Sequence, residues 1–359
     1  MAARGEGGYD CARLDGDMWV EMNQNAPTAY LWTGQVTCHD MSGRVIPCAG
    51  SGQDAEWRKG APWPEPRFET AGAVVLDRLT GLVWSHDANP AEFPLSWPEA
   101  FAFVARMNQE ATFGFTDWRL PNRVELRSLV SHQTSKPALP AGHPFVNVVH
   151  SWYWSSTTAT ISPSHAWYVN MEGGRMFFGE KRQFFLAWPV RGAGNGVLRA
   201  TGETRRRDGA GGEVPCPGGG QDGEIRTGRV WPSPRFVVRG DTAIDRLTGL
   251  GWHMTAPLPG GPVSWEEGFA AVTKLNAKVE GGWRLPNINE LESLADCSRH
   301  SPALPSGLPF HESGIVYWSS TTSLYEPDWA WALYLDKGAV GVGKKTTAFS
   351  VWAVRDAEP

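Results

Sequence analysis

Positively charged side chains stand beside aromatic ones in two stretches, 171–184 and 336–348, late in each half of the chain. The cations are Arg175, Lys181, Arg182, Lys337, Lys344 and Lys345, and aromatic neighbours include Phe177, Tyr325 and Trp329. Cations beside aromatic rings suit acidic sugars, through charge-assisted hydrogen bonds and stacking. We therefore take these cations, with Trp152, Tyr325 and Trp329, as candidate ligand-binding residues. A solvated charged loop is the alternative interpretation.

Two carboxylates flank a proline in the sequence Glu326-Pro327-Asp328. Calcium takes roughly six to eight oxygen ligands, and this tripeptide supplies two carboxylates. The first half has Ser162-Pro163-Ser164 in the corresponding place. We therefore expect an acidic turn without cofactor, with calcium at Glu326 and Asp328 as the weaker alternative.

The chain offers little that resembles an enzyme's catalytic machinery. No G-x-S-x-G nucleophile elbow is present. The loop histidines of the first half lack counterparts at the same places in the second, and we expect them to be solvated. They are His132, His143, His150 and His165. We therefore expect that this protein is not an enzyme.

Composition and charge restrict the class of partner. The 359 residues carry a net charge of −5, and the one basic run is Arg205-Arg206-Arg207, so nothing indicates nucleic-acid binding. No apolar stretch is long enough for a transmembrane helix. The polar N-terminus, residues 1–10, lacks the apolar core of a signal peptide.

The cysteines point to an oxidising compartment. Cys38 and Cys48 flank a glycine-containing turn between short β-like arms, which suits a hairpin closed by a disulfide. In the second half Cys216 matches Cys48, but Arg206 stands where Cys38 would be. Cys11, Cys216 and Cys297 cannot be paired from the sequence.

The elements that position these residues occur twice. Blocks such as Trp118-Arg119-Leu120-Pro121-Asn122 and Tyr153-Trp154-Ser155-Ser156-Thr157-Thr158 recur in order, from Trp283 and from Tyr317 respectively. The repeat is too long for a solenoid unit, and each copy is long enough to bury its own core. We therefore predict an extension at 1–32, a domain at 33–192, a linker at 193–200 and a second domain at 201–357.

Each copy is expected to be α+β. Ser96 with Glu99 forms a capping box before one helix, and Asn122 with Glu125 caps a second. Antiparallel strands follow, and the repeated tryptophans are expected in the core. Gly and Pro counts of 41 and 27 fit a turn-rich chain.

Both copies resemble the bacterial domain family named after the C-terminal domain of the Legionella collagen-like adhesin. The resemblance rests on the GQD turn, D-x-x-TGL-x-W, W-RLPN-x-x-EL, PALP-x-G, YWSSTT and W-x-VR, in this order in both copies. It implies two tandem C-type-lectin-like domains, each with two helices and a twisted antiparallel sheet. The later part of neither copy has the paired cysteines of the related formylglycine-generating enzymes.

The resemblance further implies a secreted, cell-surface or periplasmic protein that binds glycans, including acidic or sulfated ones, through its late-strand loops. The alternative is a structural or assembly module with protein partners at the cell surface. The oligomeric state stays open.

Overall fold

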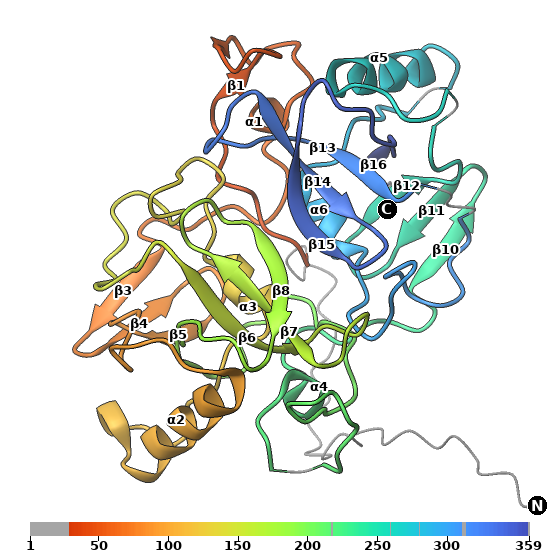
Figure 1. The fold of residues 1–359 in the computed structure, drawn as a ribbon. Helices are drawn as coiled ribbons and strands as arrows, with labels where there is room; N and C mark the ends of the chain where they lie inside the picture. The colour runs from red at the N-terminus through yellow and green to blue at the C-terminus, as the bar shows by residue number, and fades with distance from the viewer. Residues whose placement is uncertain (1–28, 217, 259, 280, 311–313, 358–359) are drawn as a thin grey trace, which may run out of the picture.

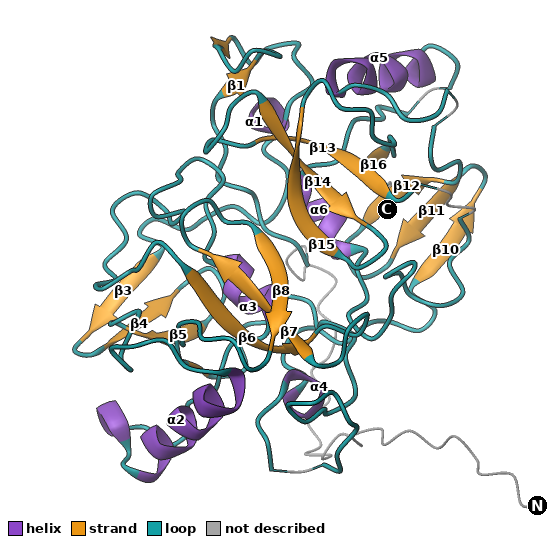
Figure 2. Ribbon diagram, in the orientation of Figure 1, coloured by secondary structure: helices purple, strands orange, loops and turns teal. Residues whose placement is uncertain are grey.

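The computed structural model describes residues 29–216, 218–258, 260–279, 281–310 and 314–357 (Figure 1). The chain combines a few helices with several small antiparallel sheets (Figure 2). Among the described residues, no helix is both long and apolar enough to span a membrane. The expected mixture of helix and sheet is therefore confirmed.

Each half builds a similar body from one four-stranded and one three-stranded sheet. The first body comprises β3 (Phe68–Ala71), β4 (Val74–Asp77), β5 (Leu82–Ser85), α2 (Trp97–Gln109), η1 (Thr112–Gly114), α3 (Arg123–Ser128), β6 (Trp152–Thr158), β7 (His165–Asn170), β8 (Met176–Glu180) and β9 (Val190–Arg191). The sheet orders are β3-β4-β5-β9 and β6-β7-β8.

Among the described residues, the second body repeats these elements in the same order, apart from η1. It comprises β10 (Phe236–Arg239), β11 (Thr242–Asp245), β12 (Leu250–His253), α5 (Trp265–Asn276), α6 (Ile288–Ser293), β13 (Val316–Thr322), β14 (Trp329–Tyr334), β15 (Ala339–Lys344) and β16 (Val354–Asp356). The sheet orders are β10-β11-β12-β16 and β13-β14-β15.

The predicted helix starts are confirmed. Ser96 and Glu99 form a capping box at α2, and Asn122 and Glu125 form one at α3. Their counterparts cap α5 and α6 in the same way. The capping glutamate of α3 also binds Arg119, whose Nη1 lies 2.6 Å from Glu125 Oε2. The W-RLPN-x-x-EL sequence therefore fixes the start of this helix to the segment before it.

The repeated tryptophans form the core of each body. Trp84 and Trp188 are fully buried and meet edge to face with ring centroids 5.7 Å apart. Trp252 and Trp352 repeat this contact at 5.3 Å. The expectation that the matched tryptophans are structural is confirmed.

The segments that precede the two bodies are exchanged between the halves. The first segment, residues 29–61, holds β1 (Cys38–His39), β2 (Val45–Ile46) and α1 (Asp54–Trp57), and α1 contacts β13 of the second body. The second segment, residues 198–229, holds α4 (Asp222–Ile225), which contacts β6 of the first body. Figure 1 shows α1 near β13 and α4 near the β6–β7 sheet.

A buried carboxylate anchors each exchanged segment. Asp54 Oδ2 accepts a hydrogen bond of 2.7 Å from Thr321 Oγ1 in β13. Asp222 Oδ2 accepts one of 2.7 Å from Thr157 Oγ1 in β6. The sequence repeat places residues 33–61 with the first body and 201–229 with the second. In space each segment is anchored to the other body by its aspartate and also bonds to its own body, as in the hydrogen bonds of His132 N to Thr33 O and of Cys297 N to Thr201 O, both 2.9 Å. Each segment therefore bridges the two bodies.

Candidate functional site

The late loops of the two halves meet at one place, where β8 and β15 lie side by side (Figure 2). The Tyr325 ring lies here between two cations, with Arg175 Cζ 5.6 Å and Lys136 Nζ 5.2 Å from its centroid. Beside it, Lys337 Nζ lies 5.4 Å from the Phe177 ring. Cations and aromatic rings from both halves therefore share one surface.

Two carboxylates neutralise part of this positive charge. Glu326 forms an ion pair with Arg175. Glu172 lies 3.5 Å from Lys136 Nζ and accepts a 3.5 Å hydrogen bond from the Tyr325 hydroxyl. We call these seven residues the seam cluster: Lys136, Glu172, Arg175, Phe177, Tyr325, Glu326 and Lys337.

The seam cluster is open to solvent. The residues Phe177 and Tyr325 are 42% and 38% exposed. The side chains of Arg175 and Lys136 are 38% and 56% exposed. A ligand can therefore reach both the rings and the cations that flank them.

The cluster exists once, although the sequence is duplicated. The sequence repeat places Ala339 where the first half has Arg175, and Gly341 where it has Phe177. It places Ile161 where the second half has Tyr325, and Gly173 where it has Lys337. The symmetry-related position therefore lacks these cations and rings.

Comparison with known protein families finds a family model that matches the chain. The model of the Lcl C-terminal domain matches residues 73–191 and again residues 241–355. The chain belongs to the Lcl C-terminal domain family. No curated protein matches the chain. Membership in the Lcl C-terminal domain family indicates an adhesin-like role at a surface.

The two Lcl C-terminal domain matches cover the two bodies except for their first strands, β3 and β10, and leave out the exchanged segments. The first match begins just before β4, and the second just before β11. Residues 29–61 and 198–229 therefore lie outside the family model, even though each is anchored in a body that the model matches.

Two predicted ligand residues, Lys181 and Lys345, are buried and already bound. Lys181 Nζ donates to the carbonyl oxygen of Asp208 at 3.0 Å and lies 4.1 Å from the Trp97 ring centroid. Lys345 Nζ donates to the carbonyl oxygen of Asp40 at 3.0 Å. Burial lowers the pKa of both ammonium groups to about 7. These lysines clamp the exchanged segments and cannot serve a ligand at the surface.

Three predicted residues, Arg175, Tyr325 and Lys337, come together in the seam cluster, and the remaining ones lie elsewhere. Arg182 pairs with Glu180 of its own hairpin, and its side chain is 85% exposed. Lys344 Nζ lies 4.0 Å from Asp328 Oδ2.

The predicted tryptophans belong more to the fold than to a ligand surface. The Trp152 ring lies 4.4 Å from the Tyr168 ring and packs against the core of the first body. Trp329 begins β14 and is partly buried. The prediction that Trp152 contacts a ligand is therefore replaced by a packing role.

The acidic tripeptide binds cations of the protein. Glu326 pairs with Arg175 and Asp328 lies near Lys344, so its two carboxylates serve different partners. Across the described residues, no group of three or more His, Cys, Asp or Glu side chains could hold a metal ion. Glu326 and Asp328 therefore each lie beside a basic side chain of the protein.

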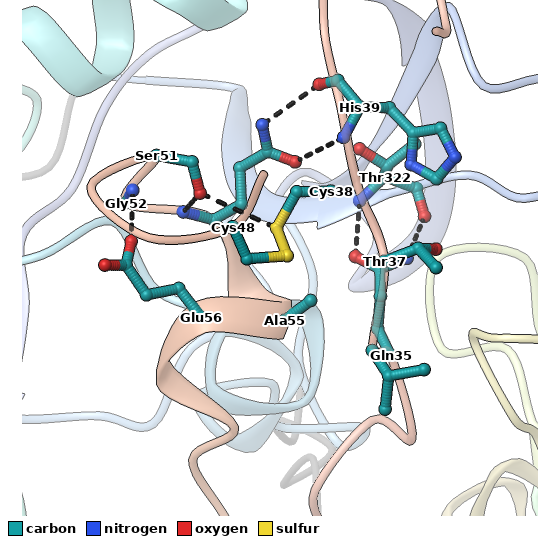
Figure 3. Close-up of a disulfide and its surroundings, with 12 residues drawn as sticks. Gln35, Thr37, Cys38, His39, Cys48, Ser51, Gly52, Ala55, Glu56 and Thr322 are labelled. Carbon is teal, nitrogen blue, oxygen red and sulfur yellow. Dashed lines mark hydrogen bonds between the residues drawn. A yellow bond between two sulfur atoms is a disulfide. The ribbon is translucent and has the colours of Figure 1, made fainter. Parts of the chain in front are cut away.

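The predicted disulfide between Cys38 and Cys48 is present and closes the hairpin of β1 and β2. Figure 3 shows it beside Glu56, whose carboxylate accepts a 2.7 Å hydrogen bond from the Gly52 amide. Cys216 is also disulfide-bonded, and Cys297 is a buried free thiol. Cys11 lies outside the described residues.

Sequence reasoning missed Lys136 and misplaced His132. Lys136 comes before the late strands, and its contact with Tyr325 joins the two halves, so no local pattern indicates it. His132 was expected to be solvated but is 3% exposed, with its ring edge-on to Trp331 at 4.8 Å. Burial and the nearby Arg127 guanidinium lower its pKa well below the usual value.

Proposed function

We propose that this chain is a non-enzymatic surface recognition protein that binds acidic glycans at the seam cluster. The observation that carries the proposal is the half-exposed Tyr325 ring flanked by the cations of Arg175 and Lys136. A sugar ring can stack on the tyrosine while its sulfate or carboxylate groups take charge-assisted hydrogen bonds from the cations.

The carboxylate of Glu326 competes with an anionic ligand for Arg175. It pairs with Arg175, so an anionic group must replace it as the guanidinium's partner. The ligand should therefore carry more than one negative group, since Lys136 and Lys337 offer further cations beside the same rings. A polymer of sulfated or uronic-acid sugars meets this requirement.

Two further parts of the proposal concern the fold and the compartment. We assign the bodies to the C-type-lectin-like folds, in which late-strand loops form the binding face. The disulfides of Cys38 and Cys216 favour an oxidising location such as the cell surface, the periplasm or the extracellular space.

An assembly role is the second candidate, and one edge strand favours it. β10 lies at the edge of its sheet and exposes Val237 and Val238, which are 38% and 48% exposed. The equivalent edge strand β3 carries Glu69 and Thr70. Apolar edge strands invite pairing with another chain.

A glycan array with the intact chain tests the proposal, at low and physiological salt and with and without calcium. We expect salt-sensitive binding to acidic polymers, weakened by Arg175→Gln and Lys337→Gln. Arg182→Gln is the matched control, because it removes an equally charged but unclustered side chain. If no glycan binds, or if Arg182→Gln weakens binding as much, the seam cluster is not a glycan site and the assembly role takes its place.

A further inference from the structure

Two short helices from the two halves face each other at the centre of the molecule. Arg127 is the fifth residue of α3, and Glu292 is the fifth residue of α6. Arg127 Nε donates to Glu292 Oε2 at 3.2 Å, and the two side chains are only 3% and 9% exposed. Equivalent positions of the two copies therefore touch each other across an approximate twofold axis, with opposite charges.

The residues that surround this pair also differ in charge between the halves. The first half adds Arg123, whose Nη2 lies 3.6 Å from Glu292 Oε1, and His132, whose Nε2 lies 3.4 Å from Arg127 Nη2. The second half has Ile288 and Cys297 at the corresponding positions. Arg123 and Arg127 of the first half thus form side-chain ion pairs with a carboxylate of the second half. The second half adds Arg199, which donates to the main-chain carbonyl oxygen of Glu292 at 2.6 Å.

Two like halves could not make this contact. Pairing two first halves would bring Arg127 against a second Arg127, each beside an Arg123. Pairing two second halves would bring two Glu292 carboxylates together with no cation from α3. A buried charge that loses its partner is strongly destabilising, and two buried like charges are worse.

The exchanged segments make each half depend on a partner. Each body holds a buried aspartate from the segment of the other half against a threonine of its strand β6 or β13, at 2.7 Å in both cases. Each body also clamps that segment with a buried lysine, Lys181 or Lys345, bound to main-chain carbonyls.

We propose that the halves form a heterospecific pair, in which each half accepts the unlike half of the same chain or of a second copy and rejects a like half. Arg127 and Glu292 supply this discrimination, and the exchanged segments supply the rest of the contact surface. This inference does not depend on glycan binding.

The test uses the full chain with a protease site inserted between Gly192 and Ala193, in the exposed stretch after β9. The protein is folded, purified and then cut, and native mass spectrometry reports which fragments stay together. We expect the two fragments to remain a one-to-one pair. Fragments that separate after cutting would overturn the proposal.

Exchange between copies is measured by mixing cut protein with isotope-labelled cut protein in sub-denaturing urea. We expect labelled and unlabelled unlike halves to pair, with pairs of like halves at least about tenfold rarer. Like pairs as abundant as unlike pairs would refute the discrimination.

Charge variants test the residues themselves. Glu292→Arg should weaken association of the cut halves about tenfold or more. The double variant R127E/E292R should associate at least about threefold more tightly than Glu292→Arg, although Arg123 still lies beside residue 292. Lys59→Gln is the control, because Lys59 pairs with Asp356 across the halves at 2.5 Å but on the surface. Should Glu292→Arg fail to fold, the association of R127E/E292R can still be compared with that of Lys59→Gln and of the unsubstituted protein. Failure of R127E/E292R to associate, or an equal loss in Lys59→Gln, counts against the proposal.

Discussion

The two exchanged segments dock in the same way but are closed by different chemistry. In the first, the disulfide of Cys38 and Cys48 ties β1 to β2. In the second, Arg206 takes the place of Cys38, donates to the Pro215 carbonyl oxygen at 2.5 Å and pairs with Glu224 at 3.4 Å. The contacts with the opposite body, through an aspartate and a lysine, are common to both segments.

This difference distinguishes two requirements of each segment, docking to the opposite body and closing its own hairpin, which the sequence repeat alone does not distinguish. Docking needs a fixed set of buried partners, because a buried carboxylate or ammonium must find its hydrogen bonds. Closing a surface hairpin needs only some link between its arms. A covalent link and a charged side chain can both provide one, so that position is free to change.

The largest expected effect is a pH dependence of the docking carboxylates. Burial raises the pKa of Asp54 and Asp222 to about 7. A carboxyl whose folded pKa lies above its unfolded value near ~3.9 stabilises the fold below that value and loses the contribution as pH rises to 7. Relative to wild type, D54N/D222N should lose this decline, on the order of 1.4 kcal/mol per pH unit for each carboxyl.

Urea denaturation from pH 4 to pH 8 measures this effect, and the single variants compare the two segments. If docking is equivalent, Asp54→Asn and Asp222→Asn flatten the curve equally. A curve for D54N/D222N that parallels wild type would show that neither carboxyl titrates with folding.

The disulfide should give the next largest effect. Its removal in C38A/C48A frees a short loop in the unfolded chain, which costs about 2–3 kcal/mol. Arg206→Met, at the equivalent position, should cost about 1 kcal/mol because it removes one hydrogen bond and one ion pair of a single side chain. Tryptophan fluorescence in guanidinium measures both, and equal losses would mean that the covalent link adds nothing to hairpin closure.

The clamp lysines should give a smaller but clear effect. Lys345→Met keeps most of the apolar stem over Trp265 but removes the ammonium hydrogen bonds to the carbonyl oxygens of His39 and Asp40, costing about 1.5–3 kcal/mol. Its neighbour Lys344 is exposed, and Lys344→Met should change the free energy of unfolding by less than about 0.5 kcal/mol. Lys181→Met should lower the free energy of unfolding as much as Lys345→Met does. A large difference between the two losses would show that the two segments do not dock equivalently.

The smallest expected effect is on ligand affinity. Glu326→Gln removes the carboxylate that competes for Arg175, so affinity for acidic polymers should rise about threefold. Arg175→Gln should lower it about tenfold. Surface plasmon resonance at physiological salt measures both, with Glu180→Gln as the control for loss of an exposed carboxylate. An equal rise in affinity in Glu180→Gln would show that the net charge of the protein, and not the removal of a competitor for Arg175, causes the effect.

Short-range features were predictable because each depends on residues close together in the chain. The capping boxes of Ser96 and Asn122 need only a glutamate three residues later, and both formed. The hairpin disulfide of Cys38 and Cys48 spans a single turn. The recurrence of tryptophans at matched positions of the two copies similarly predicted that they are core residues, and Trp84 is buried.

The candidate site was predictable only in part. Arg175, Tyr325 and Lys337 share the cation and aromatic character that the sequence indicated, whereas Lys181 and Lys345 share it too and are buried. Composition cannot separate them, because a lysine that clamps main-chain carbonyls and a lysine that waits for a ligand look alike in sequence. Lys136 joins the site through a contact between halves, which leaves no local pattern.

The sequence alone determined the duplication, the local elements and the family, since these reside in short ordered blocks such as YWSSTT and RLPN. Only the tertiary structure decided which body each N-terminal segment completes. That choice depends on threonine hydroxyls of the body, which bind an aspartate of the segment, and on main-chain carbonyls of the segment, which accept hydrogen bonds from a lysine of the body. Such groups occur throughout the chain, and they become partners only when the packing of two bodies brings them within hydrogen-bond distance and away from water.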